Sequence, residues 1–167
     1  MIDGEIPPDQ VHDPAELRQP GIGQGRDPER TPMQWDSSLP HAGFTSGQPW
    51  LPVSAATSVS GQDGEASSML SLYRRLLSIR RSNAALLEGA IKYLTAHGDV
   101  LTYERRSGDQ RLFMALNMGA ADATVPLPPG TVLLSTLPGR DGEPITEGAN
   151  RLAAGEALII SSPDRRW

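Results

Sequence analysis

Residues 100–117 read VLTYERRSGDQRLFMALN, and this stretch sets the architecture of the second half of the chain. Two runs rich in apolar, β-branched and aromatic residues, 100–104 and 112–117, flank the triplet Ser107-Gly108-Asp109. Short runs of this composition, separated by a glycine-containing turn, are typical of neighbouring strands. The stretch therefore predicts two strands joined by a turn.

The same pattern repeats on both sides of this stretch. Further short strands are expected at residues 91–94, 124–127, 132–135 and 157–160. Turn signals separate them at residues 97–99, 128–130 and 139–142. Regularly spaced short strands indicate an antiparallel sandwich or barrel. The sequence thus predicts a mainly β fold.

One segment of the chain has the period of a helix. Over residues 66–82, apolar side chains recur at spacings of three and four, and arginines fill the second half. Positive charge there suits the C-terminal end of the helix dipole, and Asn83 is the expected end. A single amphipathic helix with no other helix to pack on suggests a missing partner.

Residues 1–65 are rich in Pro, Gly, Asp and Ser and lack apolar periodicity. A short helix is expected after Asp13, which is a good N-cap; Pro14 fits the first helical position, and Glu16 sits where a capping box would place it. The aromatic residues of this segment are Trp35, Phe44 and Trp50. A disordered tail does not need them, so we expect an ordered loop that lies on another surface.

Composition excludes several classes of function. The chain has 167 residues, a net charge of −5 and no cysteine. Phosphate binding needs clustered Lys and Arg, so a nucleic-acid partner is not expected, and neither disulfides nor thiolate metal sites can form. No apolar run approaches the roughly 20 residues that span a bilayer. With no signal peptide evident, we expect a cytoplasmic protein without membrane partner, metal or cofactor.

The most distinctive motif is GRDPERTPMQWD at residues 25–36. It combines two arginines and two aspartates with a flat indole. Arginine offers planar, permanently charged donors that suit carboxylates and sugar hydroxyls, and tryptophan offers an apolar face. Such a cluster is typical of a carbohydrate pocket. The alternative is a salt-bridged loop that only holds itself in place.

This motif, followed by AGFT at 42–45 and QPWLPV at 48–53, resembles glycoside hydrolase family 13 of the α-amylase superfamily. Within that family it is similar to the α-glucosidases and oligo-1,6-glucosidases, and matching segments cover nearly the whole chain. The resemblance implies that residues 1–83 are the remnant of a truncated (β/α)8 catalytic barrel. Residues 1–65 would be the loop after its last strand and 66–82 its last helix, while 84–167 would form an antiparallel C-terminal β-sandwich domain.

The resemblance also implies a role for Arg30. In similar enzymes the arginine of this Arg-Thr-Pro step reaches the glucose pocket, held by an aspartate that would lie outside this chain. The alternative is that Arg30 only braces the loop. Arg26, Asp27 and Trp35 are expected to shape the loop rather than touch sugar.

The family's catalytic acids come from earlier barrel strands, so no catalytic residue is expected here. The acids of the first segment are read as solvated loop residues: Asp3, Glu5, Asp9, Asp13, Asp27 and Asp36. His12, His41 and His97 lack metal-ligand spacing.

Three functions remain open. The chain could be a C-terminal fragment of a retaining α-glucosidase, inactive alone, whose parent acts on terminal α-glucosidic bonds of oligosaccharides. It could instead be a non-catalytic, carbohydrate-associated β-sandwich module, or one half of a split enzyme that needs a separate barrel chain. Self-association through the 66–82 helix is a further expected interaction.

Overall fold

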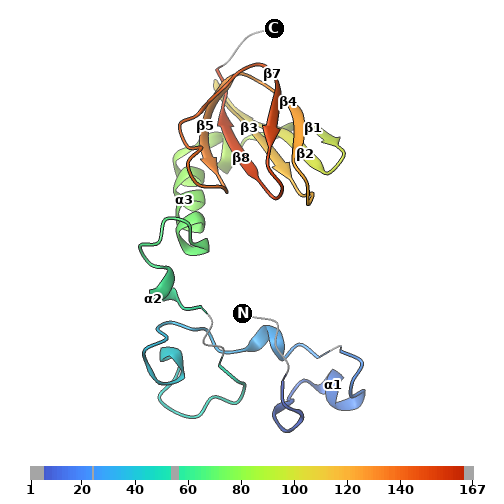
Figure 1. Ribbon diagram of the computed structural model, residues 1–167, viewed down its shortest axis with the longest axis vertical. Coiled ribbons are helices and arrows are strands. Elements are labelled where there is room, and N and C mark those ends of the chain that lie inside the picture. Colours follow the sequence, from blue (N-terminus) through green and yellow to red (C-terminus); the bar gives the residue numbers. More distant parts are fainter. Residues whose placement is uncertain (1–5, 24, 54–56, 164–167) are drawn as a thin grey trace. The chain divides into compact units, whose positions relative to one another are not determined.

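The computed structural model describes residues 6–23, 25–53 and 57–163 (Figure 1). The chain divides into two compact units, Met1–Ser71 and Leu72–Trp167. The boundary expected at residues 83 and 84 on the basis of the family resemblance stays a prediction.

The first unit is built from short helical turns linked by irregular segments. Its elements are the 3-10 helices η1 (Pro8–Gln10), η2 (Pro28–Arg30) and η3 (Pro40–Gly43) and the α-helices α1 (Pro14–Arg18) and α2 (Val59–Gln62). All but α2 begin with a proline. The proline ring fixes φ near the helical value, and the N–H that proline lacks is not needed in the first turn of a helix. The prolines of this segment therefore begin several helical turns, and each of these turns stays short.

Helix α1 confirms the short helix predicted after Asp13. The Asp13 carboxylate accepts a hydrogen bond from the Ala15 amide at 2.8 Å, and Pro14 is the first helical residue. The expected capping box is wrong, because the Glu16 carboxylate turns away from the N-cap. It accepts instead from the amides of Gly21 and Gly25, at 2.7 and 3.2 Å, and so closes the following loop.

Helix α3 (Met69–Ser82) is the long helix that the sequence predicts. It begins three residues later than expected, because the Ser68 hydroxyl accepts from the Ser71 amide and starts the helix there. At its other end the Asn83 side chain donates to the Ile79 carbonyl, which confirms the predicted end. A short helix, α4 (Ala84–Leu87), follows and was not predicted.

The rest of the second unit is antiparallel β-structure. The strands are β1 (Ala90–His97), β2 (Val100–Ser107), β3 (Gln110–Asn117), β4 (Ala123–Leu127), β5 (Gly130–Ser135), β6 (Pro144–Ile145), β7 (Gly148–Leu152) and β8 (Ala157–Ser161). One sheet has the order β1-β2-β3-β8-β5-β6, and β4 pairs with β7 in the other. All six predicted strands are confirmed. The sequence did not predict β6 and β7, since β6 has two residues and the β7 sequence GANRL contains no β-branched residue.

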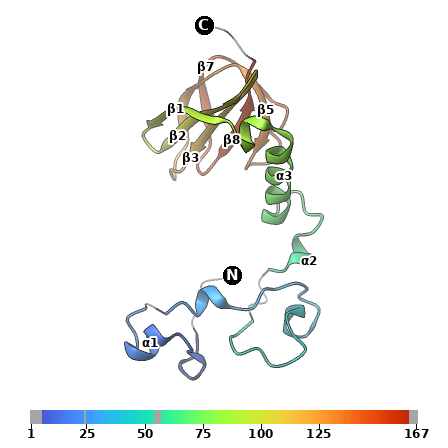
Figure 2. The same ribbon diagram turned by 180° about the vertical axis from the view of Figure 1, so that it is seen from behind.

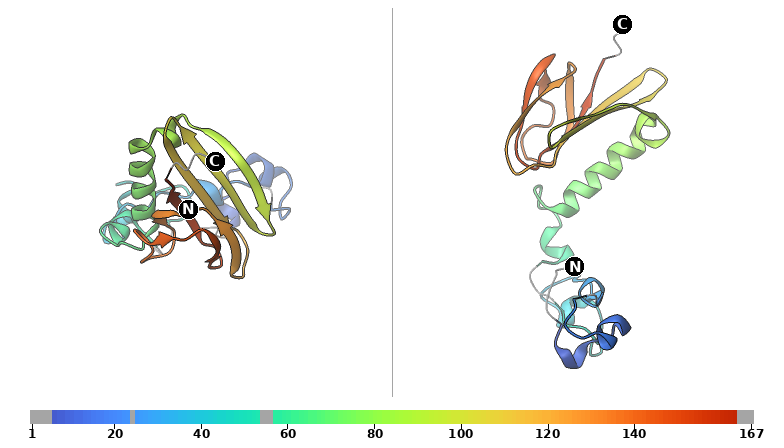
Figure 3. Two further views of the ribbon diagram at one scale, coloured as in Figure 1. Left: turned by 90° about the horizontal axis from the view of Figure 1, so that it is seen from above. Right: turned by 90° about the vertical axis from the view of Figure 1, so that its right-hand side faces the viewer.

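The two sheets enclose one apolar core, which confirms the sandwich (Figure 3). Its buried members are Val100, Ala115, Val125, Leu127, Val132, Ile145, Leu152, Leu158 and Ile160. The opposite face of the large sheet, seen from behind in Figure 2, has a second cluster around Leu112 and Met114, onto which α4 packs through the buried Ala85. Side chains of β2, β3 and β8 therefore contact apolar neighbours on both faces of the sheet.

Turn chemistry fixes the register of the first three strands. The β1–β2 and β2–β3 connections are the two-residue loops Gly98-Asp99 and Gly108-Asp109, and both glycines have positive φ, 60° and 55°. Loops of this kind match the twist of antiparallel strands. Strand β1 is an edge strand, exposed along its whole length, with a bulge between Lys92 and Thr95 where Tyr93 has a φ of 52°.

The sandwich core gives a first testable prediction. Leu158 is 1% exposed inside the core, whereas Leu94 on β1 is 65% exposed. Leu158→Ala should lower the free energy of unfolding by about 2–5 kcal/mol, because it leaves a cavity. Leu94→Ala, the matched control, should change it by less than about 0.5 kcal/mol. Urea unfolding followed by circular dichroism measures both, and equal effects would contradict this assignment of the core.

Candidate functional site

The first unit contains two buried carboxylates. Asp13 and Asp27 are 1% and 2% exposed. Asp13 Oδ2 accepts from both the backbone amide and Nε of Arg26, each at 3.3 Å. In return, Asp27 Oδ2 accepts from the amides of His12 and Asp13, at 2.6 and 2.8 Å. Each carboxylate thus binds the backbone beside the other, and we call this arrangement the aspartate clasp.

The clasp corrects the expectation that the acids of this segment are solvated. That expectation is wrong for Asp13 and Asp27, because burying a charge requires hydrogen-bonded or charged partners and both residues have them. Asp9 is exposed, as expected, and Asp36 lies in an exposed turn where it accepts from Ser38. Asp3 and Glu5 fall outside the described residues.

A sequence signal for the clasp does exist. Asp13 and Asp27 each precede a proline that begins a helical turn. Asp13 uses its carboxylate as an ordinary N-cap, but Asp27 makes no capping bond to its own turn. The repeated Asp-Pro step therefore predicts two turns, and only the structure shows that the second carboxylate reaches across to the first turn.

Arg30 lies against both carboxylates. Its Nη2 is 3.3 Å from Asp13 Oδ2, its Nη1 is 3.7 Å from Asp27 Oδ1, and its side chain is 38% exposed. Within the described residues, Asp27 Oδ1 has no hydrogen-bond partner, so Arg30 is the cation that faces it. The family resemblance placed the aspartate that holds Arg30 outside this chain. The structure shows two carboxylates of the chain itself in contact with Arg30.

Hydrogen bonds also determine the charge of Asp13. The hydrogen bond from the Ala15 amide holds the pKa of Asp13 below its ordinary value, with further lowering by the Arg26 amide and guanidinium, while burial opposes the shift. Asp13 is therefore a carboxylate at neutral pH. It can orient a cation but cannot donate a proton.

The second half of the motif organises the loop through its backbone. The amides of Trp35 and Asp36 both donate to the Ala42 carbonyl, at 2.9 and 3.1 Å. The carbonyls of Gln34 and Trp35 accept from Val59 and Ser60 at the start of α2. These bonds favour the expected loop-shaping role for Trp35, and the clasp favours the same role for Arg26 and Asp27. A contact between Arg30 and sugar stays a prediction.

The three histidines are not brought together into a ligand set. Across residues 6–23, 25–53 and 57–163, no cluster of three or more His, Cys, Asp or Glu side chains could hold a metal ion. The His12 ring instead packs on the Trp50 indole, with ring centroids 4.9 Å apart and planes tilted by 32°.

In the described part of the chain, no helix combines the length and apolarity needed to cross a bilayer.

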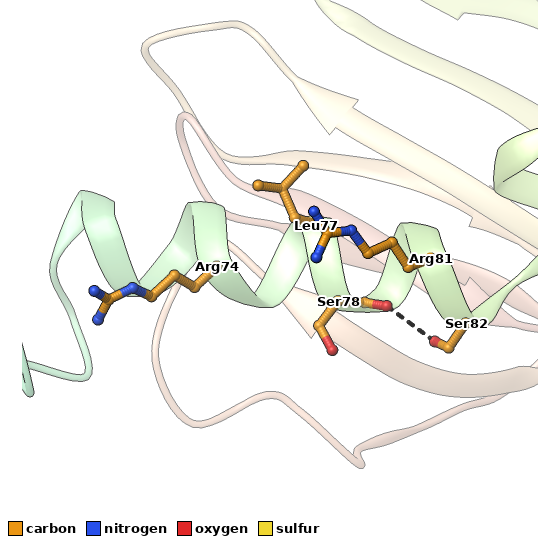
Figure 4. A pocket seen from close by; sticks show the side chains of 5 residues that line it. All are labelled: Arg74, Leu77, Ser78, Arg81 and Ser82. Atoms are coloured by element: carbon orange, nitrogen blue, oxygen red, sulfur yellow. Dashed lines mark hydrogen bonds between the residues drawn. The ribbon is translucent and has the colours of Figure 1, made fainter.

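An open depression of about 440 Å³ runs along α3 (Figure 4). It is lined by Arg74, Leu77, Ser78, Arg81 and Ser82. All five come from one helix, and the hydrogen bond within the set runs from the Ser82 hydroxyl to the Ser78 carbonyl. With no second element to enclose a ligand, this depression is a helix surface rather than a binding pocket.

The clasp can be tested by removing one carboxylate. Asp27→Ala leaves the amides of His12 and Asp13 without this acceptor, and bonds from amides to a charged acceptor are among the stronger ones. Hydrogen exchange at these two amides should accelerate on the order of tenfold. Asp36→Ala is the control: it removes the contacts of Asp36 with Ser38 and Ser60 and should leave exchange at residues 12 and 13 unchanged. Unchanged exchange at residues 12 and 13 would contradict the clasp.

The protonation of Asp13 gives a pH test. A carboxyl group with a lowered folded-state pKa stabilises the fold above its unfolded pKa, and this contribution is lost as the pH falls through the folded value. The amide signal of Ala15, which binds this carboxylate, should titrate with a midpoint below 3.8, the ordinary value. Asp13→Asn should abolish the transition. A midpoint at or above 3.8 would contradict this assignment.

Comparison with known families divides the chain in two. The model of the α-amylase catalytic domain matches residues 1–89, and a domain of unknown function, DUF3459, matches residues 90–160. The first match contains the clasp, Arg30 and α3, and the second covers almost the whole sandwich.

Individual relatives are α-glucosidases. The chain is 37% identical over 131 residues to a probable α-glucosidase of Rhizobium meliloti (strain 1021), covering 77% of this chain and 24% of the relative. It is 34% identical over 121 residues to probable oligo-1,6-glucosidase 2 of Bacillus subtilis (strain 168), covering 70% and 21%. The chain thus matches about a quarter of the length of these relatives.

Solved structures show the same fold. The crystal structure of an α-glucosyl transfer enzyme superimposes with a TM-score of 0.78 at 32% identity, covering 96% of this chain and 31% of that one. A trehalulose synthase superimposes with a TM-score of 0.72 at 29% identity, covering 82% and 26%. Together with the family models, these matches show that the chain belongs to the α-amylase superfamily of glycoside hydrolases and is similar to the C-terminal part of its α-glucosidases.

Proposed function

We propose that this chain is part of an α-glucosidase-like enzyme that hydrolyses terminal α-glucosidic bonds of oligosaccharides with retention. Its first 65 residues form one wall of the glucose pocket, and the helix at 66–82 and the sandwich are the last barrel helix and the C-terminal domain of the same enzyme. The names of the relatives, α-glucosidase and oligo-1,6-glucosidase, support an α-glucoside as the substrate.

The observation that carries this proposal is the geometry of Arg30. A guanidinium has five donors in a rigid plane, and the two buried carboxylates of the clasp face only part of it. The Arg30 side chain is 38% exposed, so part of it remains accessible to a ligand. A cation that faces two carboxylates and remains partly exposed is preorganised to donate to the hydroxyls of a bound sugar.

The same geometry supports a binding role for the chain rather than a catalytic one. Retaining glycosidases use two carboxyl groups about 5 Å apart, one of which is protonated before the reaction. In the described part of the chain, each buried acid is held by an arginine: Asp13 and Asp27 in the clasp, Glu104 by Arg111 and Glu156 by Arg140. These ion pairs support a nucleophile and an acid that are supplied from elsewhere in the active enzyme.

Helix α3 offers a surface to the remaining catalytic domain. Leu72, Leu76 and Ile79 are partly buried, and Arg75 forms an ion pair with Asp141 in the β5–β6 loop. Tyr73 and Leu77 remain exposed. This exposed apolar row supports contact with a catalytic-domain surface, whether on the same or a separate polypeptide, more than a free-standing carbohydrate module.

The isolated chain should not cleave substrate. We expect no release of p-nitrophenol from p-nitrophenyl α-glucoside by the pure 167-residue chain, because each buried acid in its described part faces an arginine. A full-length relative serves as the positive control. Turnover that co-purifies with the chain and survives a change of purification tag would overturn the binding-only role.

The role of Arg30 can be measured by sugar binding. The chain should bind isomaltose with a saturable shift of the Arg30 Nε–H signal in NMR spectra. Arg30→Lys replaces the planar fork by a point charge and should weaken binding by about tenfold. Arg18→Lys, on the exposed end of α1, is the matched control. Equal affinities of the two variants would contradict a sugar contact at Arg30.

A further inference from the structure

An exposed tryptophan stands beside the aspartate clasp. Trp50 is 57% exposed, and its indole packs on the His12 ring at a centroid distance of 4.9 Å. The next residue, Leu51, is fully buried and anchors the backbone at this point. The indole is therefore supported by His12, while much of its surface remains open to solvent.

His12 connects Trp50 to the clasp. The backbone amide of His12 donates to Asp27 Oδ2 at 2.6 Å, and the other oxygen of Asp27 faces Arg30 Nη1 at 3.7 Å. Three consecutive contacts thus link the indole to the guanidinium, although the two residues are 20 positions apart in the sequence. One carboxylate fixes both groups in the same folded segment.

A sugar needs two kinds of contact from a protein. Its hydroxyls take hydrogen bonds from placed polar groups, and its C–H faces pack on flat apolar surfaces, so pockets combine a few polar groups with aromatic walls. Arg30 supplies donors, and Trp50 supplies a large, rigid and exposed aromatic surface. We infer that Trp50 is a second sugar contact, the platform for the sugar unit adjacent to the glucose held at Arg30.

This inference rests on the proposed function and adds that the loop contacts two sugar units rather than one. It also separates Trp50 from Trp35, which is exposed but tied to Ala42 and α2 through its backbone. Trp35 shares no contact with the clasp among the bonds of the described residues, and it is therefore the matched control.

The test compares a monosaccharide with a disaccharide. Titrations of the 167-residue chain with glucose and with isomaltose are followed through the indole N–H signals. Trp50→Leu keeps apolar bulk but loses the flat ring, and it should weaken isomaltose binding by about two- to tenfold while leaving glucose binding unchanged. Trp50→Phe should retain most of the isomaltose affinity, and Trp35→Leu should retain all of it. The amide signals of residues 12–15 report whether the clasp is intact in each variant.

The outcomes separate the two proposals. If Arg30→Lys weakens binding of both sugars and Trp50→Leu changes neither, the platform is refuted and the glucose-pocket role stands. Equal loss of glucose and isomaltose binding in Trp50→Leu with an intact clasp would also refute the platform, because Trp50 would then touch the first sugar. Absence of binding of either sugar by the unmodified chain would overturn both proposals.

Discussion

The reciprocal bonding of Asp13 and Asp27 is the interaction on which the first unit depends. This unit has few buried apolar side chains, so the hydrophobic effect offers it little stabilisation. Two charges withdrawn from water instead gather four backbone amides and two guanidinium groups around them. A buried charge is costly unless every partner is in place, so the clasp favours one arrangement of the loop over all others.

The two units are stabilised in different ways, and this bears on function. The sandwich is held by a continuous apolar core between two sheets, which tolerates change at its surface. The first unit is held by directional bonds, which position individual side chains more accurately than apolar contact does. Arg30 and the His12–Trp50 pair belong to the first unit. Recognition of sugar hydroxyl groups depends on the orientation of the protein's donors, which directional bonds fix.

The sequence predicts those parts of the fold that follow from local pattern. Apolar runs flanked by glycine turns predict the six main strands, and apolar spacings of three and four predict α3.

Strand β7 is not predicted, because GANRL carries no strand pattern and is held in place by pairing with β4. The capping box expected at Glu16 is wrong because the same carboxylate can close either the local helix end or the loop that follows. In the structure it bonds the loop amides of Gly21 and Gly25. Asp13 and Asp27 were read as solvated because their burial depends on a contact across 14 residues, which no local pattern encodes. The GRDPERTPMQWD motif identified the family, but not the partners that hold its second arginine.

Strand β1 has a consequence for how the chain behaves at high concentration. An exposed edge strand offers unpaired amides and carbonyls to any other strand, the usual starting point of fibrous aggregation. Here the left-handed backbone of Tyr93 and the bulge between Lys92 and Thr95 break the regular repeat of those groups. An incoming strand can match the register on only one side of the bulge, and Lys92 adds a charge beside it. The irregularity in β1 therefore disfavours growth of the sheet at this edge.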